Sequence, residues 1–217
     1  MRFSKKIYSS LLFIFCCLTP LFADDKAVEL LEKTKDKFNT PYPTVASFTF
    51  VDEDQGSNTE LHTHGSFISL GNKFILDLPD SKSWYNGSTL WTYIEAHDEV
   101  NISIPSEEEA LAMNPAKLIE LYMKVFDCEY LKIETLTDGQ RAHHIRMNND
   151  KQNVPIESID VWVDDKDFTL KRINISTKDG KKQGIILSDI KIDKSISSDI
   201  FNFDNKSFPN AEIIDLR

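Results

Sequence analysis

Apolar and polar residues alternate along most of this chain, a pattern that predicts β-strands with one buried face. The clearest alternating positions are Ala46, Phe48 and Phe50, then Phe74, Leu76 and Leu78, then Val100, Ile102 and Ile104. Segments at 131–133, 143–147, 159–163, 173–175 and 186–192 continue the pattern towards the C-terminus. We therefore expect the chain to fold mainly as half-buried antiparallel strands.

Residues that favour tight turns separate these strands. Asn86-Gly87 lies between aromatic and apolar runs. It predicts a hairpin with a type I′ turn, in which both central residues take positive φ. Gly71-Asn72, Asp138-Gly139 and residues 178–180 mark further turns. Consecutive strands joined in this way form a meander, and about ten of them would curl into a barrel or half-barrel.

Two stretches depart from the alternation and predict helices. In residues 24–39 the apolar side chains fall at helical spacing on one face. Ser106 and Glu109 match a capping box, and Asn114-Pro115 starts a further helix. That helix has an apolar stripe typical of a helix lying across a sheet: Leu118, Ile119, Tyr122, Val125 and Phe126. The fold class that we expect is α+β, a strongly curved antiparallel β-sheet, an unclosed half-barrel, covered by a helical lid.

The N-terminus has the organisation of a secretory signal peptide. Three basic residues precede a mostly apolar stretch, 7–22, and Ala23 is followed by two aspartates. We expect cleavage after Ala23. The chain would then consist of a signal peptide, residues 1–23, and one domain, residues 24–217.

Two alternatives for the N-terminus stay open. A membrane anchor is disfavoured because the apolar run is short for a span of ~20 residues and contains Pro20. A bacterial lipidation site at Cys16 or Cys17 is disfavoured because the residue before each is not small.

The charge and the cysteines restrict the partners and the compartment. The chain has 25 Lys and Arg against 35 Asp and Glu, a net charge of −10. Removal of residues 1–23 would take away three positive charges and no negative ones, leaving 22 against 35 and a net charge of −13. Such a chain repels nucleic acid and anionic membrane surfaces. Of the three cysteines only Cys128 lies outside the signal peptide, so an exported chain would have no internal disulfide.

Residues with catalytic or metal-binding chemistry are few. Glu60, His62 and His64 share one face if they lie on a strand, but three ligands on one strand still need a fourth partner and supporting groups. We expect an exposed strand end there and no metal site. His143 and His144 would point to opposite faces of a strand. No Gly-x-Ser-x-Gly motif occurs in the sequence, and no neighbouring residue supports Cys128 as a nucleophile. We expect neither catalytic residues nor a cofactor.

An ordered set of short motifs resembles one family. In chain order it comprises Gly65-x-Phe67, Lys73-Phe74, Trp84-Tyr-Asn-Gly-Ser-Thr-Leu-Trp91-Thr-Tyr93, Glu99-Val100, Asn114-Pro115 and the closing segment 208–217. The set is similar to the periplasmic outer-membrane lipoprotein carrier family (LolA), in the form found in Bacteroidota. The resemblance extends over essentially all of residues 24–217. It implies an incomplete barrel closed by helices, with an apolar cavity that takes the acyl chains of lipoproteins.

The resemblance also implies a site, a compartment and partners. The expected acyl-chain-binding residues are Phe48, Phe50, Phe67, Phe74, Leu76, Leu78, Trp91, Ile102, Ile104, Leu118, Tyr122 and Phe126. The protein would be a periplasmic monomer, a chaperone for lipoprotein transport and not an enzyme. Its partners would be lipoproteins, an inner-membrane lipoprotein-releasing transporter and an outer-membrane acceptor, with no nucleic acid. Relatives carry an arginine that holds the lid closed. The matching position here is Leu70, so that role cannot be transferred.

Other interpretations remain at this stage. The apolar strand positions could be ordinary core, and Trp91 and Tyr93 could simply pair across a hairpin. The same half-barrel could serve as a periplasmic lipid or lipoprotein sensor, a regulatory module. An exported hydrolase or metal-dependent enzyme that uses the histidines is a third possibility.

Overall fold

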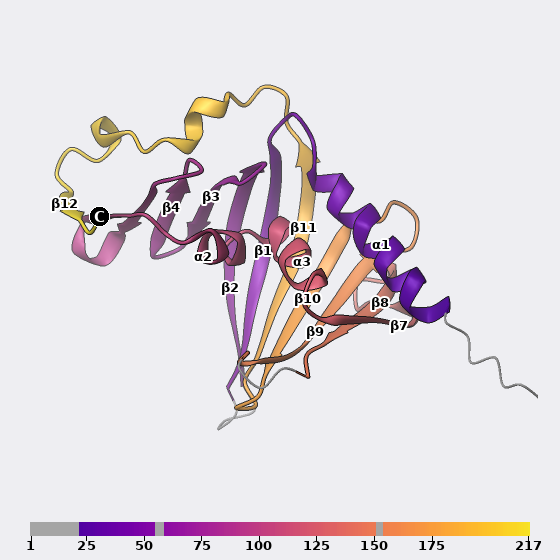
Figure 1. The fold of residues 1–217 in the computed structure, drawn as a ribbon. Helices are drawn as coiled ribbons and strands as arrows, with labels where there is room; N and C mark the ends of the chain where they lie inside the picture. The colour runs from indigo at the N-terminus through magenta and orange to yellow at the C-terminus, as the bar shows by residue number, and fades with distance from the viewer. Residues whose placement is uncertain (1–21, 55–58, 151–153) are drawn as a thin grey trace, which may run out of the picture.

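A twelve-stranded sheet organises the described part of this computed structural model, which comprises residues 22–54, 59–150 and 154–217 (Figure 1). The strands are β1 (Thr44–Asp54), β2 (Thr59–Leu70), β3 (Lys73–Leu78), β4 (Ser81–Tyr85), β5 (Leu90–Ile94), β6 (Glu99–Ser103), β7 (Asp127–Thr135), β8 (Arg141–Asn148), β9 (Ile156–Asp164), β10 (Leu170–Thr177), β11 (Lys182–Ile192) and β12 (Glu212–Asp215). Their order in the sheet is β12-β6-β5-β4-β3-β2-β1-β11-β10-β9-β8-β7.

The pairing makes an open, antiparallel meander. Each strand pairs antiparallel with its neighbours, apart from β12, which runs parallel to β6. β1 pairs with β11 and so joins the two halves of the meander. Because β12 and β7 end the sheet without pairing to each other, the barrel is unclosed. The predicted α+β half-barrel is confirmed, with twelve strands in place of about ten.

Three α-helices lie on one face of the sheet: α1 (Phe22–Phe38), α2 (Glu107–Ala112) and α3 (Pro115–Met123) (Figure 1). We call this the inner face, and the opposite one the outer face. α1 packs against β7 and α3, and its buried side chains are Ala27, Leu30, Leu31 and Thr34. None of the described helices is long and apolar enough to span a membrane.

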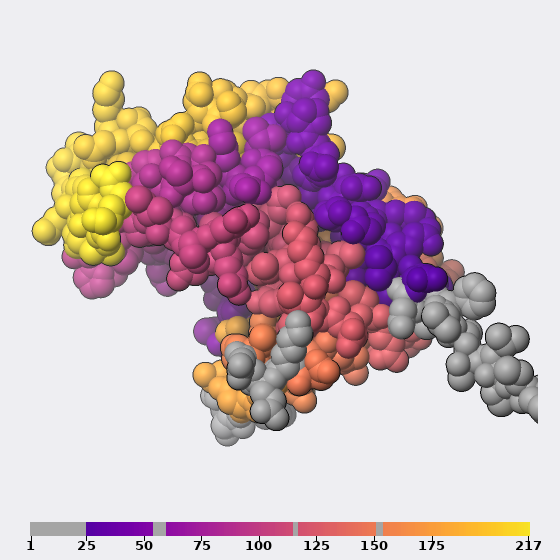
Figure 2. All heavy atoms as spheres, in the orientation of Figure 1, coloured from indigo at the N-terminus to yellow at the C-terminus, as the bar shows by residue number. Residues whose placement is uncertain are grey.

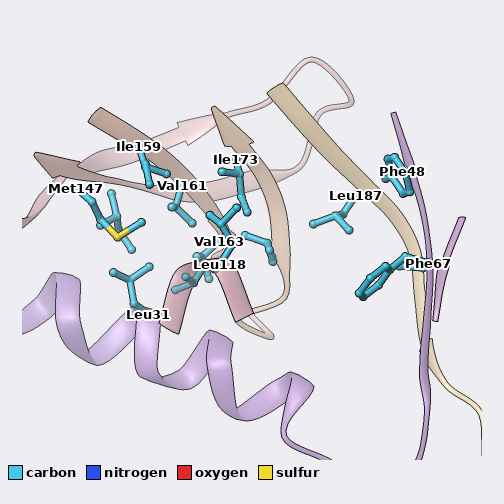
Figure 3. Packing of buried hydrophobic residues seen from close by; sticks show 14 of the residues in the cluster. Leu31, Phe48, Phe67, Leu118, Met147, Ile159, Val161, Val163, Ile173 and Leu187 are labelled. Carbon is cyan, nitrogen blue, oxygen red and sulfur yellow. The ribbon is translucent and has the colours of Figure 1, made fainter. Parts of the chain in front are cut away.

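The main core lies between the helices and the inner face. Leu31 of α1 and Leu118 of α3 point towards side chains of the sheet such as Met147, Val163 and Ile173 (Figure 3). Each of these three sheet residues is fully buried. We call this core the inner-face cluster.

The C-terminal segment, residues 193–217, covers part of the outer face, and we call it the C-terminal strap (Figure 1). It contains the 3₁₀ turns η2 (Ser198–Phe201) and η3 (Asn205–Ser207) and ends in β12. Trp84 packs edge-on against Phe203 and Phe208 of the strap, with ring centroids 5.3 and 5.5 Å away. Ile75, Trp84 and Phe201 form the centre of this second core, the outer-face cluster.

The Asn86-Gly87 hairpin forms, but its turn type differs from the prediction. β4 and β5 pair from Tyr85 to Leu90, which leaves a four-residue loop. Gly87 has φ +100°, whereas Asn86 does not have positive φ. The Asn86 carboxamide oxygen accepts hydrogen bonds from the backbone N–H groups of Ser88 and Thr89 at 3.1 and 3.0 Å. Asn86 therefore caps the loop with its side chain, which explains why the two-residue type I′ turn is not needed.

The predicted helical lid is present, with one correction at its C-terminal end. Ser106 and Glu109 form a capping box at the start of α2, as predicted. α3 ends at Met123, earlier than the apolar stripe suggests. Beyond that end Phe126 stays buried, but Val125 is 45% exposed. Val125 thus does not belong to the packed stripe.

Candidate functional site: the inner face of the sheet

Aromatic side chains from neighbouring strands form a continuous layer on the inner face of β2–β4. Phe67 and Phe74 are buried, and their rings stack with centroids 6.2 Å apart. Phe74 also contacts Tyr85 of β4, at 5.3 Å between centroids. Antiparallel partners share a face, and the pairs Phe67–Leu76 and Phe74–Tyr85 place all four residues on this one.

Gly65 makes room for the next aromatic residue of the layer. It pairs with Phe48 of β1. A Cβ atom at Gly65 would lie 2.5 Å from Cζ of Phe48 and 2.7 Å from the backbone oxygen of Asp77. The absence of a side chain therefore lets the Phe48 ring lie across β2. This contact gives a physical reason for the Gly65-x-Phe67 sequence.

Apolar side chains of α3 and of the residues that follow it cover the layer. Leu118, Ile119 and Phe126 are buried against the cluster. Lys117 pairs with Glu120 at 2.9 Å, within the same helix. In the space-filling view, α3 and α1 lie next to each other over this face (Figure 2). Packing of apolar side chains is thus the main attachment of α3 to the sheet.

The cover is incomplete around its edges. Several apolar residues that pack against the inner-face cluster are only half-buried: Phe50, Leu76, Leu78, Met113, Tyr122 and Met123. The first three come from β1 and β3, and the others belong to the segment that contains α2 and α3. Methionine is unbranched and adapts its shape to what it contacts. The boundary between the lid and the sheet is therefore apolar, deformable and partly open to solvent.

Burial shifts the pKa values of three titratable side chains at this face. Burial, and then the charge of Glu107, raises the pKa of Tyr85. Burial, and then Glu108, raises the pKa of Tyr122. Burial also lowers the pKa of His143, which lies 3.2 Å from the hydroxyl of Tyr130. Each shift favours the neutral form, as expected where water is excluded.

The outer face of β8 and β9 carries polar side chains. The Asp160 carboxylate, which is 8% exposed, accepts hydrogen bonds from Arg146 at 2.9 and 3.2 Å and lies 2.6 Å from Nε2 of His144. The His144 ring stacks on Trp162 with centroids 4.3 Å apart. His143 and His144 thus face opposite sides, as predicted. The contrast identifies the inner face as the apolar side of β8 and β9.

Most of the predicted acyl-binding residues come together on the inner face. Buried in the inner-face cluster are Phe48, Phe67, Phe74, Leu118 and Phe126, with Phe50, Leu76, Leu78 and Tyr122 packed against it. The structure does not bring Trp91, Ile102 and Ile104 to this group. Trp91 belongs to the outer-face cluster and pairs with Ile102, so both face outwards. Ile104 follows β6 and is 66% exposed. Trp91, Tyr93 and Ile102 face the side of the sheet that the C-terminal strap covers, whereas Leu90 of β5 stays on the inner face.

Sequence reasoning missed several residues of the inner-face cluster: Tyr85, Leu90, Ile145, Met147, Ile159, Val161, Val163, Leu170, Ile173 and Leu187. The alternation in 143–147 and 159–163 was the signal for five of them. It could not show that β11 pairs with β1 and so places these strands on the same surface as Phe48.

Leu70 does not face the lid. It lies at the end of β2 and packs against the outer-face cluster. An arginine side chain at this position would extend from the outer face, on the opposite side of the sheet from the helices.

The histidine pair of β2 forms no metal site in the described part of the chain. His62 lies 3.1 Å from Glu60, whereas His64 contacts Thr49 at 3.0 Å. All three predicted residues are exposed. No group of three His, Cys, Asp or Glu residues within 22–54, 59–150 and 154–217 is arranged to hold a metal ion.

Comparison with known proteins places the chain in a family. Residues 24–181 match the family model of the outer membrane lipoprotein carrier protein LolA, and the chain belongs to this family. A search of curated protein sequences found no match.

Solved structures resemble this fold at low sequence identity. An uncharacterized conserved protein from Thermus thermophilus is 12% identical, with a TM-score of 0.58 over 88% of this chain and 99% of that one. A DUF1329 family protein from Desulfovibrio piger is 14% identical, with a TM-score of 0.49 over 83% and 97%. A LolA superfamily protein from Nitrosomonas europaea is 12% identical, with a TM-score of 0.42 over 82% and 97%.

Proposed function

We propose that this protein is an exported carrier that shields the acyl chains of lipoproteins between the inner face of its sheet and the helices α1–α3. The observation that supports this most is the half-buried apolar boundary between the lid and β1–β3, which includes Phe50, Leu76 and Met113. An acyl chain that entered there would contact apolar side chains on both sides. Membership of the lipoprotein carrier family agrees with such a ligand.

The physical need for a carrier is large. Exposing an acyl chain of ~15 methylenes to water costs about 12 kcal/mol, at ~0.8 kcal/mol each. A lipoprotein with two or three such chains cannot cross an aqueous compartment unshielded. A curved sheet with one apolar face and a helical cover provides the shield without chemistry, metal or nucleotide, so we propose a carrier and not an enzyme.

Release requires that the cover can open. The lid segment is attached mainly by Leu118, Ile119 and Phe126, whose apolar contacts have little directional preference. An acyl chain can replace such contacts with equivalent ones, so opening of the lid is coupled to binding of the acyl chain. We propose that the chain works in the periplasm after removal of residues 1–23. There it would receive cargo from an inner-membrane transporter and pass it to an outer-membrane acceptor.

The test is a titration of the protein, prepared from residue 24 onwards, with a fluorescent fatty-acyl probe. The wild type should bind saturably. Leu118→Glu places a charge at a position that is 5% exposed, a cost of several kcal/mol unless the lid moves away from the sheet. We expect this variant to lose probe binding while its circular dichroism stays that of a folded sheet.

Val125→Glu is the matched control. It introduces the same charge in the same segment, but at a side chain that is 45% exposed. It should bind the probe like the wild type. Absence of saturable binding by the folded wild type would refute the carrier function. Normal binding by Leu118→Glu would show that the helices are not the cover.

A further inference from the structure

The inner face changes from apolar to polar along a single row of paired residues. From β1 to β6 the row runs Ala46, Phe67, Leu76, Ser83, Thr92 and Asn101. Antiparallel partners share a face, so these six side chains lie side by side on the inner face. The first three belong to the inner-face cluster or pack against it. We call the last three, Ser83, Thr92 and Asn101, the polar row.

The neighbouring row shows that the polar row continues the candidate acyl site. Phe74, Tyr85 and Leu90 are partners in β3–β5, and all belong to the inner-face cluster. Ser83 lies two residues before Tyr85, and Thr92 two residues after Leu90. Side chains two apart on a strand point the same way. The polar row is therefore directly beside apolar side chains of the same face.

The side chains of the polar row have donors and acceptors that are available to a ligand. Ser83 and Thr92 are joined by one hydrogen bond of 3.1 Å between their hydroxyls. Each hydroxyl can take part in further bonds. Within the described residues, the carboxamide of Asn101 makes no hydrogen bond. Thr92 and Asn101 are half-buried, so a ligand can reach them.

The row is also neutral, in a chain in which 28% of residues are charged. On this face of β6 and β12, the edge of the sheet beyond the polar row, charge is found at the start of the two strands, where Glu99 pairs with Glu212. On the outer side of β5 and β6, Trp91, Tyr93 and Ile102 are large and apolar, as a surface under the strap requires. The central inner positions of the same strands, the hydroxyl of Thr92 and the carboxamide of Asn101, suit an uncharged hydrogen-bonding ligand.

We propose that the polar row binds the ester and amide groups that join acyl chains to glycerol and to the first residue of an acylated polypeptide. This inference rests on the proposed function, since the tails would occupy the apolar part of the same face. Strands are ~4.8 Å apart, so three steps from Leu76 to Asn101 cover ~14 Å, which accommodates such a head group. Ester carbonyls accept from hydroxyl and amide donors, and an amide N–H donates to the Asn101 oxygen.

The experiment compares two probes on the same variants. One is a pyrene-labelled hydrocarbon, which has a tail and no hydrogen-bonding head. The other is a synthetic lipopeptide with two palmitoyl esters on a glyceryl-cysteine. The double variant Thr92→Val with Asn101→Leu should weaken the lipopeptide by about tenfold and leave the hydrocarbon affinity unchanged. Thr92→Ser keeps the hydroxyl and should bind both probes like the wild type.

Thr49→Val is the control for loss of a threonine hydroxyl elsewhere. Its hydroxyl contacts His64 on the outer face, so neither affinity should change. Equal affinities of wild type and double variant for the lipopeptide would overturn the polar-row inference alone. So would an equal loss for both probes, which would indicate a structural defect. Failure of the wild type to bind the hydrocarbon would overturn the proposed function and the inference together.

Discussion

Replacement of Gly65 by alanine is the sharpest test of how the inner face is packed. The new Cβ would lie 2.5 Å from Cζ and 2.9 Å from Cε1 of Phe48, and 2.7 Å from the backbone oxygen of Asp77. The Phe48 ring can rotate, but the Asp77 oxygen belongs to β3, which is held by its pairing with β2 and β4. The ring must therefore move into the inner-face cluster, and the strands must also separate slightly.

The two contributions to stability oppose each other. Overpacking a filled core typically costs ~1–3 kcal/mol. Alanine in place of glycine returns ~0.4–1 kcal/mol, because the unfolded chain loses freedom. We therefore expect a net loss of about 1–2 kcal/mol, which for a domain of this size lowers the melting temperature by about 2–8 °C.

Thermal unfolding followed by circular dichroism measures the effect, with Ser66→Ala as a control at the next position of β2. The double variant Gly65→Ala with Phe48→Leu should recover part of the loss, because leucine removes the atoms nearest the new Cβ. A melting temperature for Gly65→Ala equal to that of the wild type would refute the close approach of Phe48 to β2.

Three further predictions test other parts of the structure. Trp84→Ala should cost ~3–5 kcal/mol and expose the strap to trypsin; unchanged resistance of residues 193–217 would contradict the packing against Trp84. The pKa of His143 lies below its ordinary 6.5, so the unfolded state takes up the proton first. Stability should fall as the pH drops below 6.5, less so in His143→Gln, and equal pH profiles in urea unfolding would exclude this origin. Hydrogen exchange should show residues 107–126 less protected than β3, and equal protection would mean that the lid is held by more than packing.

Much of the fold follows from local patterns in the sequence. Alternation identifies the strands, and the capping box at Ser106 identifies the start of α2, because both depend on residues close together in the chain. The Asn86-Gly87 hairpin was found for the same reason. Its turn type was not, because the Asn86 side chain caps a longer loop in a way that the dipeptide alone does not specify.

The sequences of β5 and β6 alone could not predict on which face of the sheet their large apolar side chains lie. Trp91 and Ile102 alternate with polar residues as a buried face should, and they are indeed packed, but on the outer side. Which side is buried depends on the strap, more than 90 residues later in the chain, whose Phe208 packs against Trp84 and Tyr93. Such a choice between faces is a tertiary property, since a strand with period two fits either face equally well.

Photocrosslinking with a fatty acid that carries a diazirine on its tail shows which face of the sheet binds an acyl chain. After irradiation of the loaded protein, mass spectrometry assigns the adducts to residues. We expect adducts on the inner face and the lid, at Phe50, Leu76, Met113 and nearby side chains. A lipopeptide with two palmitoyl chains should compete with their formation. Adducts concentrated on Trp84, Phe208 and the rest of the strap, or adducts whose formation the lipopeptide does not reduce, would contradict this expectation.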